Sequence, residues 1–333
     1  MRSTSEMNSA SQQSKANSCL KQDCVVAILN YNGKHLLPDC LDSLALQTFS
    51  DFETLVIDNG STDGSKELLA TMYPWVSVLA LEKNLGFSAA YNVCIREALE
   101  RDFGFVVLLN NDTWVAKDFL AELLQAIQGD DCIGAVCPKI YFAARPETIW
   151  YAGGDFSLWT CRPRHRGWKE LDRGQFDTAR QITLATGCAM LVRCSALQEV
   201  GLLDEQFWAY LEDVEWSVRF LKSGYKLSFA PKARVWHRCG ETSVKKLGSG
   251  SQALPQYLST RNALLLARKH ARWWQIPTHF LSFLVNHVAF YTALRFWRRD
   301  FRAVWAIYRG IGAFLLDTID DSRRTTERIR VSG

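Results

Sequence analysis

Short, wholly apolar segments alternate with amphipathic segments from Cys24 to Val136, and this alternation limits the possible folds more than any other feature of the chain. The apolar segments are typical of buried strands and occupy residues 25–29, 55–57, 76–81, 105–109 and 133–136. Apolar residues recur at helical spacing between them, at Leu37, Leu41 and Leu44, from Ser65, over 86–100 and over 117–127. A strand that is apolar along its whole length is buried on both faces. The pattern therefore predicts an α/β fold with a mostly parallel central sheet covered by helices.

The regular alternation ends after Lys139, where a stretch rich in Gly, Trp and Arg begins. We expect loops and a small added sheet in this stretch. The elements expected after it are a strand at 188–192, a helix at 212–223, and short strands at 226–229 and 234–236. Together these segments predict one domain over residues 23–245.

The two ends of the chain differ from this domain in composition. Residues 1–22 are rich in Ser, Gln, Asn and Lys and lack the apolar core of a signal peptide, so we expect a disordered N-terminal tail. Residues 252–333 have a helical pattern, which predicts a C-terminal amphipathic helical region.

Charge and cysteine content narrow the class of protein. The chain has 333 residues and a formal net charge of +4, which is too small to indicate a nucleic-acid partner. Its ten cysteines include no CxxC pair and no zinc-like grouping, and several lie in apolar, strand-like segments. We therefore expect buried free thiols in a reducing cytosol rather than a disulfide framework.

The C-terminal region combines basic residues with Trp and other apolar residues. Eight Lys or Arg residues and one acidic residue, Asp300, lie between Arg261 and Arg302. Residues 276–294 contain no Asp, Glu, Lys or Arg, but polar residues recur on one helical face: Thr278, His279, Ser282, Asn286 and His287. Such a face favours a helix lying in a membrane interface. Burial in the core or in a dimer contact is the second interpretation, and a membrane span is the third.

Polar residues follow several of the predicted strands at the point where each strand ends. They are Asn30, Asp58 and the run from Asn110 to Asp112. In parallel sheets, ligands bind beyond the carboxyl ends of the strands. These positions are therefore the expected site.

Asp112 is a candidate ligand for Mg²⁺ or Mn²⁺, which one or two carboxylates hold together with phosphate oxygens. His237 could add a nitrogen ligand, which would favour Mn²⁺. On spacing alone, a His beside a Trp is more often a packed side chain than a metal ligand. Both interpretations stay open for His237.

Glu212 and Asp213 begin a predicted helix, where the positive end of the helix dipole favours carboxylates. One of two adjacent acids could accept a proton from an attacking hydroxyl while the other orients it. The alternative interpretation is that the two acids have no catalytic role, because acidic residues are common in the first turn of a helix. The pair is therefore a candidate for the catalytic residues.

Six short motifs follow one another along the chain: Asn30-Tyr31-Asn32-Gly33, Asp58-Asn59-Gly60-Ser61-Thr62-Asp63-Gly64-Ser65, Asn84-Leu85-Gly86-Phe87-Ser88-Ala89-Ala90-Tyr91-Asn92, Leu108-Leu109-Asn110-Asn111-Asp112-Thr113, Thr186-Gly187-Cys188-Ala189-Met190-Leu191-Val192-Arg193 and Tyr210-Leu211-Glu212-Asp213-Val214-Glu215-Trp216. Their order resembles that of family-2 glycosyltransferases, the inverting group with the nucleotide-sugar-binding GT-A fold, which is Rossmann-like. The chain resembles this family over residues 24–245.

The resemblance implies a role for each matching position. Donor-binding roles fall on Tyr31, Asp58, Asn84, Gly86 and Asn110, metal-binding roles on Asp112 and His237, and catalytic roles on Asp213 and Glu212. Asp213 would be the base. The chain departs from the family's metal-binding Asp-x-Asp motif because Asn110 stands at its first position. A metal held by Asp112, His237 and the donor diphosphate is the resulting expectation.

The resemblance implies transfer of a sugar from a nucleotide-diphosphate sugar to a hydroxyl of a glycan or lipid-linked glycan, as in bacterial enzymes that build rhamnose-containing surface polysaccharides. The expected location is the cytoplasm, on the cytoplasmic face of the membrane, because basic and Trp residues favour anionic lipid surfaces. Two alternatives remain: a non-catalytic, membrane-associated protein with this fold, and a sugar-phosphate nucleotidyltransferase. No Gly-rich, Arg-containing loop follows the first strand, which disfavours the nucleotidyltransferase, and no GxGxxG motif supports a dinucleotide oxidoreductase.

Overall fold

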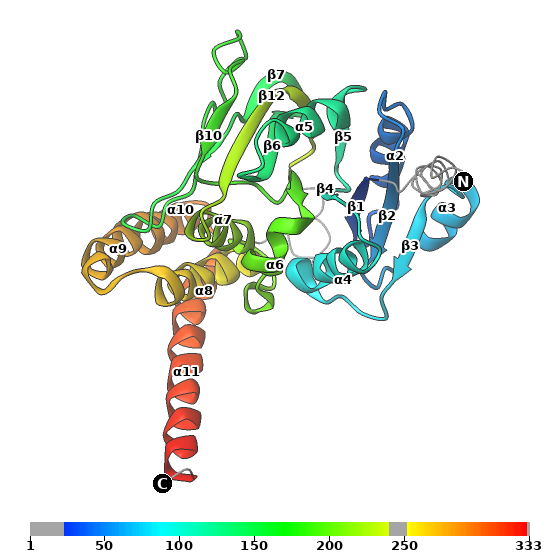
Figure 1. The fold of residues 1–333 in the computed structure, drawn as a ribbon. Helices are drawn as coiled ribbons and strands as arrows, with labels where there is room; N and C mark the ends of the chain where they lie inside the picture. Colours follow the sequence, from blue (N-terminus) through cyan, green and yellow to red (C-terminus); the bar gives the residue numbers. More distant parts are fainter. Residues whose placement is uncertain (1–22, 240–251, 332–333) are drawn as a thin grey trace, which may run out of the picture.

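The computed structural model describes residues 23–239 and 252–331, so the tail expected at residues 1–22 lies outside the described residues. One large sheet forms the centre of the molecule (Figure 1). Its strands are β1 (Cys24–Asn30), β2 (Phe52–Asp58), β3 (Ser77–Ala80), β4 (Phe105–Asn110), β5 (Thr113–Val115), β6 (Ile133–Phe142), β7 (Arg145–Tyr151), β10 (Arg180–Ile182), β11 (Ala189–Arg193) and β12 (Lys226–His237). They are ordered β10–β12–β6–β11–β4–β1–β2–β3, with β5 paired to β12 and β7 paired to β6.

The sheet is mostly parallel, as the sequence predicts. Strands β1 to β4 are parallel, and β12 runs parallel to β6. Strand β11 is antiparallel to both of its neighbours, β4 and β6. Because β11 reverses direction once on each side, the carboxyl ends of β12 and β4 lie at the same edge of the sheet.

The helices of this sheet domain lie close to the predicted positions, apart from one short helix at Leu197–Val200 that the sequence does not predict. They are α2 (Leu37–Ala45), α3 (Ser65–Met72), α4 (Gly86–Glu100), α5 (Phe119–Gln128), α6 (Leu197–Val200) and α7 (Glu212–Lys222). The longest of them, α4, packs against β1, β2 and β4 through the buried face formed by Ala90, Tyr91, Cys94, Ile95 and Ala98. That spacing is the amphipathic pattern of a helix covering a sheet.

Two strands are longer than the sequence predicts. Residues 226–229 and 234–236 belong to one strand, β12, whose register against β6 shifts between Ala230 and Arg234. Pro231 lies in the shift, and a proline cannot donate a ladder hydrogen bond. Strand β6 continues through Lys139, a buried residue whose ammonium contacts Asp172 and Asp177 at 2.9 and 2.5 Å. The small added sheet is present as β8 (Gly154–Asp155) paired with β9 (Arg164–His165).

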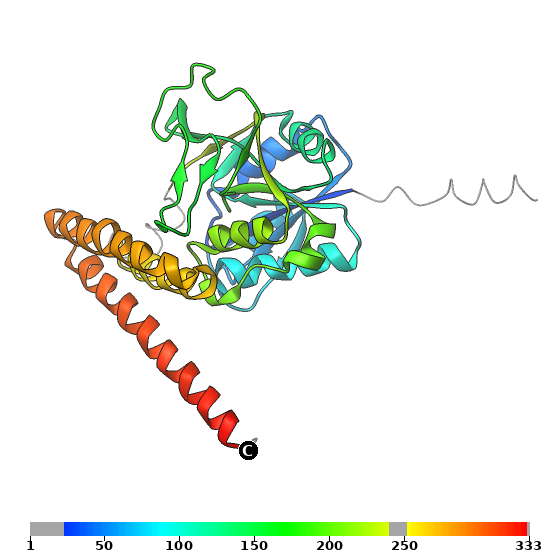
Figure 2. The same cartoon turned by 60° about the vertical axis from the view of Figure 1, so that its left-hand side comes forward.

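The C-terminal region is helical, as expected. Its elements are α8 (Ala253–His270), α9 (Ile276–Ser282), the π-helical segment η4 (Phe283–Ala289), α10 (Phe290–Trp297) and α11 (Phe301–Val331). Helix α11 packs along α8 and then extends away from the sheet domain, as Figures 1 and 2 show. Among the described residues, no helix combines the length and the hydropathy needed to cross a membrane.

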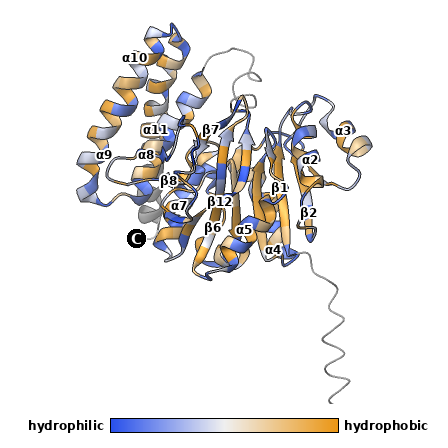
Figure 3. Cartoon of the chain, turned by 90° about the horizontal axis from the view of Figure 1, so that it is seen from above, coloured by the Kyte–Doolittle hydropathy of each residue, from blue (hydrophilic) through white to orange (hydrophobic). Residues whose placement is uncertain are grey.

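The polar face of α9 and η4 points toward the rest of the protein. Four of its five residues contact other elements, in the pairs His279–Leu158, Ser282–Thr160, Asn286–Arg162 and His287–Thr260. The fifth, Thr278, is exposed and bonds within its own helix. Large apolar side chains on the other side of the helix are exposed, and we call these the apolar face: Phe280, Leu281, Leu284, Val285, Phe290, Phe296 and Trp297. Figure 3 shows hydrophobic residues along α9 and α10 as well as in the sheet.

Candidate active site

The polar residues that end the parallel strands lie side by side, as the sequence predicts. Asn30 is in register with Asp58 on the neighbouring strand, and Leu29 is in register with Asn110. Asn30 is fully buried; it donates a hydrogen bond to Asp58 at 3.2 Å and accepts one from Asn111 at 2.7 Å. The strand ends therefore form a closed hydrogen-bond network beneath the edge of the sheet.

Strand β12 brings His237 to the same edge. His237 is in register with Thr113 of β5, the residue after Asp112. Its Nε2 lies 3.3 Å from the Asp112 Oδ1, and both side chains are buried. Burial alone would lower the pKa of His237, but the neighbouring Cys188 and Asp112 outweigh burial and hold this pKa well above its usual value. The family resemblance implies this pairing, whereas residue spacing alone does not, because the pairing depends on the register between two strands far apart in the chain.

The donor set at Asp112 and His237 fits a divalent cation that also binds substrate oxygens. One carboxylate and one imidazole are suitable ligands for Mn²⁺, and Mg²⁺ or Mn²⁺ bound with a nucleotide needs only one or two protein ligands. Within residues 23–239 and 252–331, no group of three His, Cys, Asp or Glu side chains is arranged to hold a metal by itself. The proton on His237 would compete with a metal for the same pair of groups.

A cavity of about 470 Å³ opens in front of these residues. Its size is within the range of ligand pockets. Seven of the nine sequence-predicted site residues line it: Tyr31, Asn84, Gly86, Asn110, Glu212, Asp213 and His237. The other two, Asp58 and Asp112, are 0% and 3% exposed and lie behind the cavity wall. The structure thus brings the predicted residues together but keeps these two carboxylates in the layer beneath.

The loop before α4 is shaped by Asn84 and Gly86. The side-chain oxygen of Asn84 accepts hydrogen bonds from the Gly86 backbone N–H at 2.8 Å and from the Asn59 side chain at 3.0 Å. Gly86 has a φ of +85°, and a Cβ at this position would lie 2.6 Å from the indole ring of Trp208. Only glycine allows both this backbone conformation and this close contact.

Glu212 and Asp213 lie at the start of α7, after Tyr210 and Leu211, which have φ values of +68° and +67°. Non-glycine residues in this left-handed region are strained, and such strain is typical of functional sites. The Asp213 carboxylate accepts hydrogen bonds from the backbone N–H groups of Gly187, at 2.9 Å, and Val214, at 2.8 Å. These contacts fix its orientation at the cavity wall.

The two carboxylates differ in their surroundings. Glu212 is 6% exposed, and its Oε2 has no hydrogen-bond partner among the described residues. Burial, followed by the charge of Asp213, raises the pKa of Glu212 well above its usual value. Burial also raises the pKa of Asp213, but the backbone hydrogen bonds oppose this rise. Asp213 is therefore the member of the pair that ionises first.

Helix α7 is held in place by its next acidic residue. Glu215 contacts Arg219 at 2.7 Å and His270 of α8 at 2.8 Å, and Arg219 also donates to the backbone carbonyls of Val200 and Leu202. Burial alone would raise the pKa of Glu215, but hydrogen bonds from His270 and Arg219 outweigh burial and lower it. This network connects α7 to the C-terminal helices.

Several residues that line the cavity were not predicted from the sequence. Trp150 packs edge-on against His237, with 4.9 Å between ring centroids, and against His165 at 4.5 Å. Burial lowers the pKa of His165 to about 4, so its imidazole is neutral near pH 7. Trp208 also lines the cavity and packs against Gly86. The only sequence signal for these residues was the Trp-rich composition of the middle stretch, which has no readable spacing.

Known proteins resemble this chain in sequence and in fold. A family model described as "Glycosyl transferase family 2" matches residues 25–201. An N-acetylglucosaminyl-diphospho-decaprenol L-rhamnosyltransferase of Mycobacterium tuberculosis is 30% identical over 272 residues, which are 76% of this chain and 86% of the relative. The dTDP-rhamnosyl transferase RfbF of Shigella flexneri is 25% identical over 222 residues, which are 65% of this chain and 71% of the relative.

Among solved structures, a mannosyltransferase from Pyrobaculum calidifontis in complex with GDP-Man and Mn²⁺ has the same fold. It aligns with a TM-score of 0.52 and 16% identity, covering 89% of this chain and 87% of that one. This likeness identifies the α/β fold with its C-terminal helices as GT-A, as the sequence motifs imply.

Proposed function

The chain belongs to glycosyl transferase family 2 and is a glycosyltransferase, and from this premise we propose that it transfers a sugar with inversion at the anomeric carbon. The donor would be a nucleotide-diphosphate sugar, and the acceptor would be a hydroxyl of a glycan or lipid-linked glycan. One observation carries the proposal: a single cavity is lined both by the motif residues Tyr31, Asn84 and Gly86 and by the two carboxylates Glu212 and Asp213.

Asp213 is the proposed base. Its carboxylate is oriented by two backbone N–H groups and ionises before Glu212, which leaves it able to accept a proton from a bound hydroxyl. As that proton leaves, the acceptor oxygen bonds to the anomeric carbon, and the bond from this carbon to the diphosphate breaks with its electron pair. Glu212, which keeps its proton to higher pH, would orient the bound sugar as a hydrogen-bond donor.

Asp112 and His237 are the proposed ligands of Mg²⁺ or Mn²⁺, which when bound neutralises charge on the leaving diphosphate. The Mn²⁺ in the mannosyltransferase complex supports this part of the proposal. Tyr31 and Asn110 at the cavity wall are proposed to contact the donor, and Asn84 and Gly86 to shape the loop around it. Asp58 would act through Asn30 and Ser61 rather than by direct contact.

A rhamnosyl donor and a lipid-linked acceptor are the proposed substrates, because the relatives named above are rhamnosyltransferases and one acts on an N-acetylglucosaminyl-diphospho-decaprenol. Synthesis of a cell-surface polysaccharide would be the process served. Attachment to the cytoplasmic face of a membrane is proposed from the apolar face of α9 and α10 and the arginines around it, such as Arg298 and Arg299.

The first experiment is a screen of nucleotide-diphosphate sugars with and without Mn²⁺ or Mg²⁺, read by thermal shift and by slow donor hydrolysis. The proposal predicts that one donor stabilises the protein in a metal-dependent way and that Asp112→Ala abolishes this stabilisation. No response to any donor would instead favour a non-catalytic protein with the same fold. Consumption of a nucleoside triphosphate with a sugar phosphate would favour a nucleotidyltransferase.

A further inference from the structure

A second cavity, of about 510 Å³, lies between the sheet domain and the C-terminal helices. It adjoins the candidate active site, because the same five residues line both cavities: Pro163, Tyr210, Leu211, Pro255 and Ser259. Leu211 immediately precedes the carboxylate pair. The two cavities therefore adjoin at the residues that lead into α7, two positions before Asp213.

The second cavity carries positive charge. Arg162 and Arg295 line it, and no acidic residue is among the described residues of its wall. The Nε of Arg295 is buried and has no hydrogen-bond partner in the part of the chain that the structure describes. Asp300 supplies some counter-charge to Arg295, but its own oxygens accept hydrogen bonds from the backbone of Gln252 and Ala303. A guanidinium in this position has unused donors for an anion.

His287 does not add to the positive charge of this cavity. Burial lowers the pKa of His287 to about 4, and its Nε2 lies 2.9 Å from the hydroxyl of Thr260. Arg162 is exposed at the cavity rim and donates a hydrogen bond to Asn286 at 3.2 Å. The cationic groups are thus the two arginines, Arg162 from the segment between β8 and β9 and Arg295 from α10.

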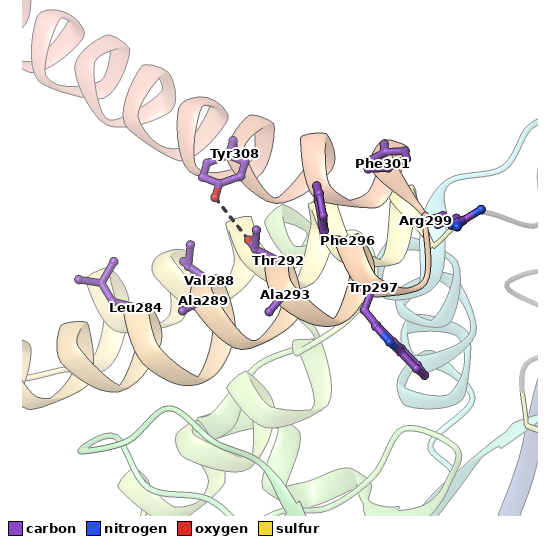
Figure 4. Close-up of a pocket in the computed structure, with 10 residues that line it drawn as sticks. All are labelled: Leu284, Val288, Ala289, Thr292, Ala293, Phe296, Trp297, Arg299, Phe301 and Tyr308. Carbon is purple, nitrogen blue, oxygen red and sulfur yellow. Dashed lines mark hydrogen bonds between the residues drawn. The ribbon is translucent and has the colours of Figure 1, made fainter.

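The remaining side of the cavity is apolar and leads to the molecular surface. Phe283, Phe290 and Tyr291 line this side, and Phe290 is 57% exposed, so it belongs both to the cavity and to the apolar face. Around the same helix, an apolar groove runs between α10 and α11; Figure 4 shows Leu284, Val288 and Phe296 among the residues that line it. An apolar chain leaving the cavity at Phe290 would meet hydrophobic side chains rather than water alone.

We propose that the second cavity binds a lipid-linked diphosphate acceptor, with Arg162 and Arg295 binding its phosphate groups and its hydrocarbon chain leaving past Phe290 over the apolar face. The lining of the two adjoining cavities carries the proposal: Asp213 lines the first, the two arginines line the second, and the exposed Phe290 belongs both to the second cavity and to the apolar face. This assignment rests on the proposed function, because it gives that function its acceptor.

The test is equilibrium binding of radiolabelled farnesyl diphosphate to the full chain in non-ionic detergent, with farnesol and inorganic pyrophosphate measured in parallel. EDTA is present throughout, so that no metal at Asp112 can hold the diphosphate. We expect Arg295→Gln and Arg162→Gln each to weaken binding by about 10-fold, since each removes charge-assisted hydrogen bonds. Arg298→Gln is the matched control, because this exposed arginine is three residues from Arg295 but does not line the cavity.

The other outcomes would overturn the proposal. Equal weakening by all three arginine variants would indicate general attraction between charges. Farnesol binding as tightly as farnesyl diphosphate would indicate an apolar groove alone, and pyrophosphate binding as tightly would indicate an anion site without a lipid. Nucleotide-sugar binding to the unaltered chain is measured separately. Its absence would reject the proposed function, whereas arginine-independent farnesyl diphosphate binding would reject only the acceptor site.

Discussion

Polar side chains face the protein interior both in the sheet domain and in the helix formed by α9, η4 and α10. Apolar side chains differ between these two regions in how far they are buried. In both regions, polar residues point inward and bond to other parts of the protein, as Asn30 does to Asp58 and Ser282 to Thr160. In the sheet domain, apolar residues from the strands and the covering helices form a large buried core. Along the helix they are exposed, with Leu281 at 63% and Trp297 at 79%. Patches of this kind are typical of surfaces that meet a lipid or a partner.

Removal of the ion-pair partner of a buried carboxylate in the sheet domain is expected to have the largest effect on stability. Arg219→Ala would leave the Glu215 carboxylate, whose side chain is 2% exposed, with only the His270 ring as a side-chain hydrogen-bond partner. Breaking a buried pair costs about 3–5 kcal/mol of unfolding free energy, measured by urea denaturation. Arg96→Ala is the control, because its pair with Glu205 is about half exposed and should contribute less than about 1 kcal/mol. Similar losses of unfolding free energy in both variants would show that Glu215 and Arg219 do not hold α7 in place.

The stability difference between wild type and Arg219→Ala should depend on pH. Because the folded-state pKa of Glu215 is lowered, its interactions stabilise the protein above the ordinary carboxyl pKa of about 4.3 and are lost as the pH falls through the folded-state value. The stability gap between wild type and Arg219→Ala should therefore narrow in acid.

Substitutions in the apolar face should leave the stability of the fold nearly unchanged but weaken binding to lipid vesicles. Leu281→Ala with Phe296→Ala should change the unfolding free energy by only about 0.5 kcal/mol per site, because both side chains are exposed. Binding to vesicles of anionic lipid should weaken by roughly 10-fold or more, since burial of one such side chain contributes about 1.5–3 kcal/mol. Leu266→Ala, at a fully buried position in α8, should destabilise the fold by about 2–5 kcal/mol. If the double variant binds vesicles as wild type does, the apolar face does not meet lipid.

The smallest expected effect concerns Glu212. Because its folded-state pKa is raised, ionisation of Glu212 opposes folding, and stability is lost as the pH rises from the ordinary carboxyl pKa through the folded-state value. Glu212→Gln should therefore raise the unfolding temperature at pH 8, and the difference should shrink toward pH 5. Thermal unfolding at the two pH values checks this. An unchanged or lower unfolding temperature at pH 8 would argue that Glu212 is stabilised in its charged form.

The sheet domain is the region whose structure follows most directly from the sequence. Continuous apolar strands and the polar residues that end them follow from burial on both faces of a sheet, and they correctly bring Asn30, Asp58 and Asn110 to one edge. The sequence does not distinguish residues that line the cavity from those beneath it, because that depends on side-chain packing. Asp58 and Asp112 are in the lower layer for this reason.

Two features could not be predicted from local patterns. Strand β6 runs past Lys139, a charged residue whose burial is compensated by the distant carboxylates of Asp172 and Asp177. The direction of the polar face in 276–294 depends on what the helix packs against, since an amphipathic pattern shows two faces but not which one is buried. The structure turns the polar face toward Thr160 and Thr260 and leaves the apolar face outside.

The most direct test of the account is to measure donor binding and sugar transfer together in Asp213→Asn and in wild type, once the donor is identified. We predict that Asp213→Asn binds the donor with near wild-type affinity while transfer slows by about 10²-fold or more, because the proton of the acceptor hydroxyl then has no base. Transfer at a near wild-type rate by the folded variant would contradict the assignment of Asp213, and Glu212 would become the candidate base.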